Sequence, residues 1–406
     1  MTNLYGSVAR YQLAHRLDGA IAHLEDRASP LVVVDLDAFD ANADDLIRRA
    51  NGKPLRLASK SVRVPALIER ALAKPGFNGI LSYTLREALW LAGAGLSDDI
   101  VMGYPTVDLG ALRTLIADPH ARRSITLMVD DVAQLDVIDH CRGLHEGDVR
   151  VALDIDAGLR MGRSHVGPKR SPLHDAAEVI AFARQVHARA GFRLVGVMTY
   201  EGQVAGVQDA VPHQRAKSIV VRRLKSASIS QLQMRRAAVA KDLADIVELD
   251  FWNAGGSGSV ESSGADPVVT EIAAGSGLLV PTLFDHYESF QPRPAAYYAV
   301  QVVRRPTDGI ATVAGGGFIA SGPAGKDRAP QPWAPPSLHL TGLEGAGEVQ
   351  TPLTGPGAKD LKIGDNVWFR HAKAGELAEH TNVVHLLSEE SIVDSVPSYR
   401  GLGHAW

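Results

Sequence analysis

The chain has 406 residues, enough for one large domain with a buried core and a second, smaller one. Hydrophobic residues make up 45% and charged residues 22% of it, as in ordinary globular proteins. The net charge of -4 argues against nucleic acid and anionic membranes as partners, and the single cysteine, Cys141, excludes a disulfide framework and a cysteine-rich metal site. Residues 1–20 contain no apolar run of the signal-peptide type, and no stretch approaches the roughly 20 apolar residues of a membrane span. We therefore expect a cytoplasmic protein.

The N-terminal part of the chain predicts helices and one strand. Residues 1–28 have the composition of short helical segments, which Ser29-Pro30 ends. The β-branched run 31–37 is typical of a buried strand. A helix is predicted over 38–50, because its apolar residues share one face and Asn51-Gly52 follows it.

From residue 55 onward, strand patterns alternate with helix patterns. Strands are predicted over 55–60, 79–84, 99–105, 124–130, 150–156, 194–202, 249–255 and 268–275, and helices over 65–74, 85–92, 109–117, 132–141, 174–189 and 214–248. Eight strands that alternate with helices predict a (βα)8 TIM barrel, an α/β fold. The alternative is an open doubly wound sheet, but no G-x-G-x-x-G sequence follows the first strand.

After residue 280 the pattern changes to short strands without convincing helices. Strands are predicted over 298–304, 310–314, 349–353, 366–370 and 382–387, and the five prolines between 323 and 336 predict a loop. We therefore expect a barrel domain over 38–280 and an antiparallel β domain over 281–406. Residues 1–37 are expected to belong to the β domain.

Lys60 stands at the end of the first predicted barrel strand. Its stem lies among Leu57 and Ala58, and the cation Arg63 follows three residues later. Desolvation and a neighbouring cation both disfavour the ammonium form of a lysine, as a lysine that forms a Schiff base requires. A strand-end lysine can equally be a surface residue whose stem covers apolar neighbours, so the rest of the chain must decide.

Two loops rich in glycine and serine follow the seventh and eighth predicted strands, where barrel enzymes often hold a phosphate. The candidate phosphate-binding residues are Gly255, Gly256, Ser257, Gly258 and Ser259 in the first loop and Gly275 and Ser276 in the second. Their backbone amides and hydroxyls can donate to an anion. Strand one neighbours strand eight in a closed barrel, so Lys60 is expected to face this phosphate cradle.

Arg160 and Tyr200 follow the fifth and sixth predicted strands, at the same end of the barrel. An arginine and a tyrosine could orient an aromatic cofactor there by hydrogen bonding or stacking. A salt bridge or a structural place at the barrel rim is an equally good interpretation of each residue taken singly.

Several short sequences along the chain match a known family. They are 29–37, Leu55-Arg56 before Lys60, Glu87-Ala88 with Gly93 and Gly95, Asp99-Ile100 with Tyr104-Pro105, Arg160 with Gly162, Tyr200 with Gly202, 255–257, and Glu271 with Gly275. With them the chain resembles the pyridoxal-phosphate enzymes of the alanine racemase fold (fold type III), closest to the D-threonine aldolase and D-serine dehydratase branch. Ala58 departs from the pattern, which usually has a histidine there. The resemblance implies pyridoxal 5'-phosphate as cofactor and a homodimer in which the β domain closes the partner's active site.

The resemblance also implies roles for single residues. Lys60 would form the internal aldimine, and residues 255–259 would bind the cofactor phosphate. Arg160 would lie by the phenolic oxygen of the cofactor ring, although the segment that carries Arg160 is one residue shorter than usual. Racemases carry an arginine on the pyridine nitrogen after the position of Glu271, where this chain has Ala273 and Ala274. A racemase-like electronic arrangement is therefore not expected.

Enzymes of this branch bind a divalent metal through a histidine and, two residues later, a cysteine or aspartate. The chain keeps His371 but has Lys373 at the second position, and a protonated amine cannot ligate a metal. Either no metal binds and Lys373 supplies the positive charge, or His371 holds the metal with Glu376 or Glu379. We favour the first alternative.

The predicted function is a pyridoxal-phosphate-dependent lyase that acts on D-β-hydroxy amino acids, of the D-threonine aldolase or D-serine dehydratase type. Lys60 would carry the cofactor, and His371 or Lys373 would act on the β-hydroxyl as base or acid. One alternative is an amino acid racemase, which needs a second base on the opposite face. Another is a non-catalytic pyridoxal-phosphate-binding protein, against which residues 281–406 argue, because single-domain carriers of this fold lack a β domain.

Overall fold

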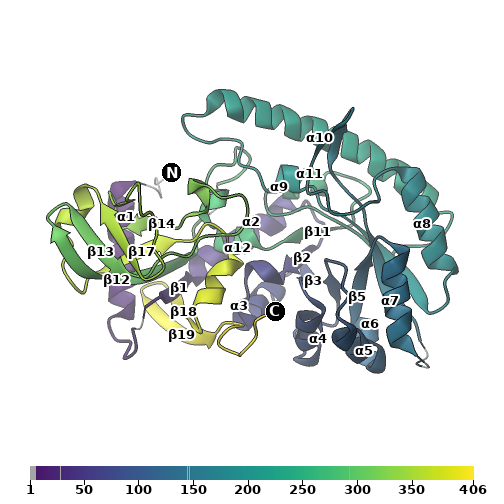
Figure 1. Ribbon diagram of the computed structural model, residues 1–406, viewed down its shortest axis with the longest axis horizontal. Coiled ribbons are helices and arrows are strands. Elements are labelled where there is room, and N and C mark those ends of the chain that lie inside the picture. Colours follow the sequence, from purple (N-terminus) through teal and green to yellow (C-terminus); the bar gives the residue numbers. More distant parts are fainter. Residues whose placement is uncertain (1–5, 28, 144, 146, 292) are drawn as a thin grey trace.

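Eight short, mainly aliphatic strands close into a parallel barrel in the computed structural model, which describes residues 6–27, 29–143, 145, 147–291 and 293–406 (Figure 1). Around the barrel the strands are β2 (Leu55–Ala58), β3 (Phe77–Ser82), β4 (Ile100–Met102), β5 (Ile125–Val129), β6 (Val149–Asp154), β9 (Phe192–Thr199), β10 (Phe251–Ala254) and β11 (Glu271–Ala274). β11 pairs with β2 and closes the ring. Every predicted barrel strand is present, so the TIM barrel prediction is confirmed.

Helices alternate with these strands and cover the outside of the barrel (Figure 1). They are α2 (Leu36–Arg49), α3 (Pro65–Leu72), α4 (Leu85–Gly93), α5 (Leu109–Ala117), α6 (Pro119–Ser124), α7 (Val132–Arg142), α8 (Ala176–Ala188), α9 (Gly202–Ala205), α10 (Arg215–Leu243), α11 (Val260–Gly264) and α12 (Ser276–Leu279). Short polar residues begin several of them: the side chains of Thr84 and Asp108 each accept a 3.1 Å hydrogen bond from a first-turn amide. None of the described helices is both long and apolar enough to cross a membrane.

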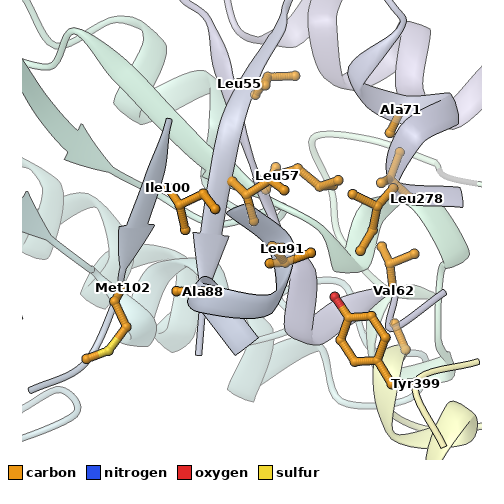
Figure 2. Packing of buried hydrophobic residues seen from close by; sticks show 14 of the residues in the cluster. Leu55, Leu57, Val62, Ala71, Ala88, Leu91, Ile100, Met102, Leu278 and Tyr399 are labelled. Atoms are coloured by element: carbon orange, nitrogen blue, oxygen red, sulfur yellow. The ribbon is translucent and has the colours of Figure 1, made fainter. Parts of the chain in front are cut away.

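Side chains of β2 alternate between the two faces of the barrel wall, as the pleat requires. Leu55 and Leu57 are fully buried in the main apolar core with Leu91 and Leu278 (Figure 2). Arg56 is 2% exposed and makes two 2.7 Å hydrogen bonds to the Glu271 carboxylate of β11. A buried arginine is tolerated here because its charge is paired.

A second sheet holds nine strands in the described part of the chain. They are β1 (Leu31–Asp35), β12 (Ala296–Thr307), β13 (Ile310–Ala314), β14 (Gln331–Ala334), β15 (His339–Leu340), β16 (Gln350–Thr354), β17 (Asn366–Arg370), β18 (Val383–Ser388) and β19 (Ser391–Pro397). All pairs are antiparallel except β1 with β18. The N-terminal helix α1 (Ser7–Ile21) packs on this sheet through Leu17 and Ile21, against Val33 and Trp368.

Four strand regions differ from the sequence prediction, among them β15 and β19, where no strand was predicted. The proline-rich stretch predicted to be a loop contains β14, where Pro332 lies opposite Phe369 of β17. β14 pairs with β17 alone in the sheet, and an edge strand tolerates a residue that has no amide hydrogen. A two-stranded hairpin, β7 (Leu159–Met161) and β8 (Ser164–Val166), also follows β6 and was not predicted.

Short 3-10 turns complete the chain: η1 (Ser59–Ser61), η2 (Thr282–Phe284), η3 (Lys326–Arg328), η4 (Pro356–Lys359) and η5 (Gly375–His380). The C-terminal segment then returns to the barrel. The Tyr399 amide donates a 2.9 Å hydrogen bond to the Arg63 carbonyl, and the Tyr399 ring lies beside Val62 (Figure 2). The end of the β domain thus packs against the turn that follows β2.

Candidate active site

Lys60 lies in η1, directly after β2 and at the carboxyl end of the barrel. Its Nζ donates a 2.5 Å hydrogen bond to the hydroxyl of Tyr104, which follows β4. Arg63 donates from Nε to the Lys60 carbonyl at 3.0 Å and forms an ion pair with Glu379 of η5. The lysine turn is therefore held from its backbone, while its amine faces the barrel mouth.

The first glycine-rich loop needs its glycines for close packing. A Cβ on Gly258 would lie 2.2 Å from the Ala205 carbonyl oxygen and 2.7 Å from the Tyr287 ring. Gly255 has a φ of +84°, a conformation that side chains rarely adopt. Gly275 of the second loop lies just as close to the lysine turn, since a Cβ there would be 2.6 Å from the Ala58 carbonyl oxygen.

Serine hydroxyls join the two loops and the lysine turn. Ser257 Oγ accepts hydrogen bonds from the amides of Gly275 at 3.3 Å and Gly277 at 2.9 Å. Ser61 Oγ lies 3.0 Å from Ser276 Oγ. The structure therefore brings together the two loops that the sequence analysis assigned to a phosphate and the lysine that was expected to face them.

A buried carboxylate supports the first loop from below. Glu201 accepts hydrogen bonds from Ser259 Oγ at 2.9 Å and from Arg236 of α10 at 3.0 Å, and it also receives those of the Gly255 amide and Ser263 Oγ. Arg236 binds Asp266 as well, at 3.1 Å. The Ser259 hydroxyl thus belongs to this support. Sequence reasoning missed Glu201 and Arg236, which no local pattern brings together.

These residues fit pyridoxal phosphate. The phosphate requires donors at a site that the backbone can approach closely, and the loops would offer the amides of Ser257, Gly258 and Ser276, which make no hydrogen bond to the described residues. The aldehyde requires a primary amine within the same mouth, and Lys60 supplies it. Tyr200 follows β9 at this mouth; burial raises the pKa of its hydroxyl, whereas the charges of Lys60 and Arg170 oppose that rise.

Arg160 is directed elsewhere by the β7–β8 hairpin. Its side chain is 43% exposed and lies 3.9 Å from Asp175, and its amide donates to Gln231 at 3.0 Å. Its role beside the cofactor stays a prediction. Another arginine, Arg170, does reach the mouth, with its guanidinium carbon 5.8 Å from the ring centres of both Tyr104 and Tyr200.

The β domain supplies the remaining part of the site. Gly375 of η5 packs directly on the lysine turn, because a Cβ there would lie 1.8 Å from the Lys60 carbonyl oxygen. Lys373, just before η5, donates from Nζ to Ser321 Oγ at 2.8 Å and lies 3.8 Å from Glu376. His371 and Lys373 are therefore brought to the barrel mouth of their own chain.

Burial changes the acid–base properties of both residues. It lowers the pKa of the His371 imidazole, which is only 4% exposed. Its Nδ1 contacts the backbone of Lys373 at both the carbonyl oxygen and, at 3.2 Å, the amide nitrogen, and its Nε2 is buried without a hydrogen-bond partner among the described residues. Burial also lowers the pKa of the Lys373 amine; Glu376 opposes this shift, and Arg328, Lys60 and Arg170 add to it. We expect a neutral His371 and a Lys373 that gives up its proton more readily than a free lysine.

The donor set at this position does not fit a divalent metal. His371 is the one imidazole of the expected pair of ligands, and the other position is an amine that binds Ser321. Within the described ranges, no three histidine, cysteine, aspartate or glutamate side chains gather as a metal-binding group.

Glu87 of α4 links the lysine turn to the C-terminal segment and was matched in the sequence without a role. It accepts a 2.9 Å hydrogen bond from the Tyr399 hydroxyl and a 2.8 Å hydrogen bond from the Tyr83 amide. Burial raises the pKa of its carboxyl to about 7. Tyr104 likewise was matched without a role, whereas Arg170 lies in a loop with no sequence signal.

Comparisons with known proteins agree with this geometry. Residues 34–279 match the family model of the alanine racemase N-terminal domain. A D-threonine aldolase of Arthrobacter sp. is 27% identical over 251 residues, which are 61% of this chain and 60% of the relative. The match thus spans less than two thirds of that relative's length.

Solved structures share the whole architecture. The D-threonine aldolase of Filomicrobium marinum superimposes with a TM-score of 0.75 at 19% identity, over 92% of this chain and 95% of its own. The D-threo-3-hydroxyaspartate dehydratase of Delftia sp. HT23 gives a TM-score of 0.72 at 21% identity, over 95% and 100%. At these identities the likeness shows the fold, and the family model covers more than half of the chain. The chain therefore belongs to the alanine racemase N-terminal domain family.

Proposed function

We propose that the protein is a pyridoxal-phosphate-dependent lyase of D-β-hydroxy amino acids. The observation that carries this proposal is the meeting of Lys60, the two glycine loops and Lys373 of the β domain at one barrel mouth. The names of the aldolase and dehydratase relatives support the same substrate class.

Lys60 would hold the cofactor covalently through its amine, and the loops at 255–259 and 275–277 would hold the phosphate. Bound pyridoxal phosphate supplies an electron sink for negative charge at the substrate Cα. The residues of the chain would then decide which substrate bond breaks, through the protons they offer or accept at the β-hydroxyl.

Lys373 is the residue we assign to the β-hydroxyl. Its side chain is 37% exposed, whereas the Nε2 atom of His371 is buried. In this proposal Lys373 supplies the positive charge at the β-hydroxyl in place of a metal, and His371 positions Lys373 through the contacts of its Nδ1 with the Lys373 backbone. The protein would therefore work without a divalent metal.

An ammonium at the β-hydroxyl favours elimination over aldol cleavage, because elimination requires an acid there and cleavage requires a base. In elimination the Cβ hydroxyl would leave as water with the proton of Lys373, and the proton released from Cα would restore the Lys373 ammonium through solvent. Hydrolysis of the remaining enamine then gives a 2-oxo acid and ammonia. Aldol cleavage to glycine and an aldehyde is the second candidate, which the D-threonine aldolase relative supports.

Product analysis with the holoenzyme tests the proposal. D-Serine and D-threonine are incubated with it, and 2-oxo acid, ammonia, glycine and aldehyde are measured. We expect 2-oxo acid and ammonia in equal amounts, and a loss of at least 100-fold in kcat for Lys373→Gln. Glycine and aldehyde would instead establish the aldolase. Formation of the L-enantiomer alone would establish a racemase. A protein that binds pyridoxal phosphate but converts no D-amino acid would be a non-catalytic carrier.

Metal content tests the role of Lys373 separately. Protein prepared in metal-free buffer should contain no stoichiometric Mn or Zn and should keep its activity in a chelator. Stoichiometric metal that disappears in His371→Ala would contradict the assignment.

We also propose a homodimer, as the family resemblance implies. Light scattering of the holoprotein should give twice the mass of one chain, and a monomer that retains full activity would contradict this.

A further inference from the structure

Arg170 is a cation of the barrel mouth, and its guanidinium lies between two tyrosine rings rather than against a carboxylate of the described residues. Among the described residues it forms no ion pair or hydrogen bond, and its contacts are with the Tyr104 and Tyr200 rings. It also lines a cavity with Tyr200, Gly103 and Asp154. Lys60 hydrogen-bonds the same Tyr104. One tyrosine therefore has the lysine amine at its hydroxyl and the guanidinium near its ring.

The loop that carries Arg170 is fixed to the end of β6 at two points. Ser171 Oγ donates a 2.7 Å hydrogen bond to the Asp154 carbonyl, and the Asp156 amide donates a 2.8 Å hydrogen bond to the Leu173 carbonyl. A Cβ on Gly167 would lie 2.7 Å from Gly158 Cα. The guanidinium is therefore presented by an anchored segment, which reduces the entropy lost when it binds a ligand.

The charges around Arg170 leave it free to take an anion. Asp154 lines the same cavity, and the charge of Arg170 lowers the pKa of its carboxyl; burial and the neighbouring Asp130 outweigh this effect and raise the pKa to about 7, which weakens Asp154 as a counter-ion. Asp156 is engaged with His165 at 2.6 Å. The other carboxylates near the mouth are paired with other cations, Glu376 with Lys373 at 3.8 Å and Glu379 with Arg63. Lys60 and Lys373 are cations themselves.

We propose that Arg170 binds the α-carboxylate of the amino acid substrate. A guanidinium binds a carboxylate through two parallel hydrogen bonds, which fixes orientation as well as position. The carboxylate would then lie on the Tyr104–Tyr200 side of the mouth, away from the β-domain side where Lys373 meets the β-hydroxyl. This inference rests on the proposed function only in requiring an amino acid as the substrate.

The test compares two ligands that differ at the carboxyl group alone. D-Alanine and its amide, D-alaninamide, have no β-hydroxyl and undergo neither elimination nor aldol cleavage. Each is titrated against the holoenzyme, and binding is followed through the absorption of the bound cofactor. Wild type, Arg170→Gln, Arg170→Lys and the matched control Lys169→Gln, an exposed neighbour in the same loop, are measured.

We expect Arg170→Gln to weaken D-alanine binding at least tenfold and to leave D-alaninamide binding within twofold. Arg170→Lys should recover part of the loss, and Lys169→Gln should bind both ligands as wild type does. The resting absorption spectrum and the affinity for pyridoxal phosphate should not change. Equal weakening of both ligands, or a shifted resting spectrum, would overturn the proposal, the second because Arg170 would then face the cofactor.

Failure of the lyase proposal gives a different result. A wild-type holoenzyme that binds D-alanine but forms no product from D-serine or D-threonine refutes the lyase reaction, while the Arg170 titrations still decide the role of the arginine.

Discussion

The two sides of the candidate site are held by different kinds of interaction. Beneath the phosphate loop, the side chains of Arg236 and Glu201 are 3% and 2% exposed. On the β-domain side, Lys373 and Glu376 are 37% and 25% exposed. Buried pairs are costly to break, whereas partly exposed pairs contribute little to stability. In the proposed function the first side would therefore fix the position of the cofactor, and the second would exchange charge and protons with the substrate.

Among the substitutions that test this difference, Arg236→Ala should lower the stability of the protein the most. It leaves the Glu201 and Asp266 carboxylates buried without their cation, which costs about 3–5 kcal/mol of unfolding free energy. Urea unfolding of the protein should show the loss. Arg193→Ala, an arginine 58% exposed, is the matched control and should change stability by less than about 0.5 kcal/mol. Equal losses of unfolding free energy in the two variants would contradict the greater cost of breaking a buried ion pair.

Glu87→Gln tests the contact between α4 and the C-terminal segment through the pH dependence of stability. The pKa of Glu87 rises from its ordinary 4.5 to about 7 in the folded protein, so the folded state binds more protons than the unfolded state between these values. Its contribution to stability is therefore present below about pH 4.5 and is lost as pH rises through 7, by roughly 3 kcal/mol.

Unfolding of wild type and Glu87→Gln is compared at several pH values between 4.5 and 8. The difference in stability between them should change across this window, and Glu69→Gln, an exposed glutamate, should follow wild type. A constant difference between wild type and Glu87→Gln would show that Glu87 does not titrate there.

Gly258→Ala tests the close packing of the phosphate loop. The new methyl group would meet the Ala205 carbonyl and the Tyr287 ring, so the loop must move. We expect pyridoxal phosphate to bind at least about tenfold more weakly, which corresponds to about 1.4 kcal/mol. Gly309→Ala is the control, because nothing lies within 4 Å of a Cβ there. Unchanged affinity in a folded Gly258→Ala protein would show that this loop does not bind the cofactor phosphate.

Glu376→Gln should have the smallest effect on stability, within about 1 kcal/mol, since the pair with Lys373 is partly exposed. It removes the carboxylate that raises the pKa of Lys373. The alkaline limb of the kcat profile should therefore move to lower pH, because the ammonium is lost earlier. Glu344→Gln, an exposed glutamate of the same domain, should leave the profile unchanged. If the alkaline limb of the kcat profile did not move in Glu376→Gln, the ionisation of Lys373 would not control the reaction.

Local patterns in the sequence predicted most of the barrel side. The alternation of strands and helices identified all eight barrel strands, and the glycine loops were found because each follows a strand end. β14 was missed because prolines are typical of loops, and its edge position, which permits Pro332, is a tertiary property.

The polar support of the site could not be predicted in the same way. Glu201 and Arg236 lie 35 residues apart and meet only through the packing of α10 on the barrel. Arg170 reaches Tyr104 through a loop, whose path no periodic pattern describes. Lys373 was singled out because the resemblance implies a metal ligand at that position, and its contact with Ser321 came only from the structure.

Chemical mapping of the cofactor lysine tests the central claim most directly. Purified protein is incubated with pyridoxal phosphate, its visible absorption is recorded, and the complex is reduced with borohydride before peptide mass mapping. We predict a visible band that reduction bleaches, with the adduct on Lys60, and no such band in Lys60→Ala. A protein that stays colourless, or an adduct on another lysine such as Lys373, would contradict the account.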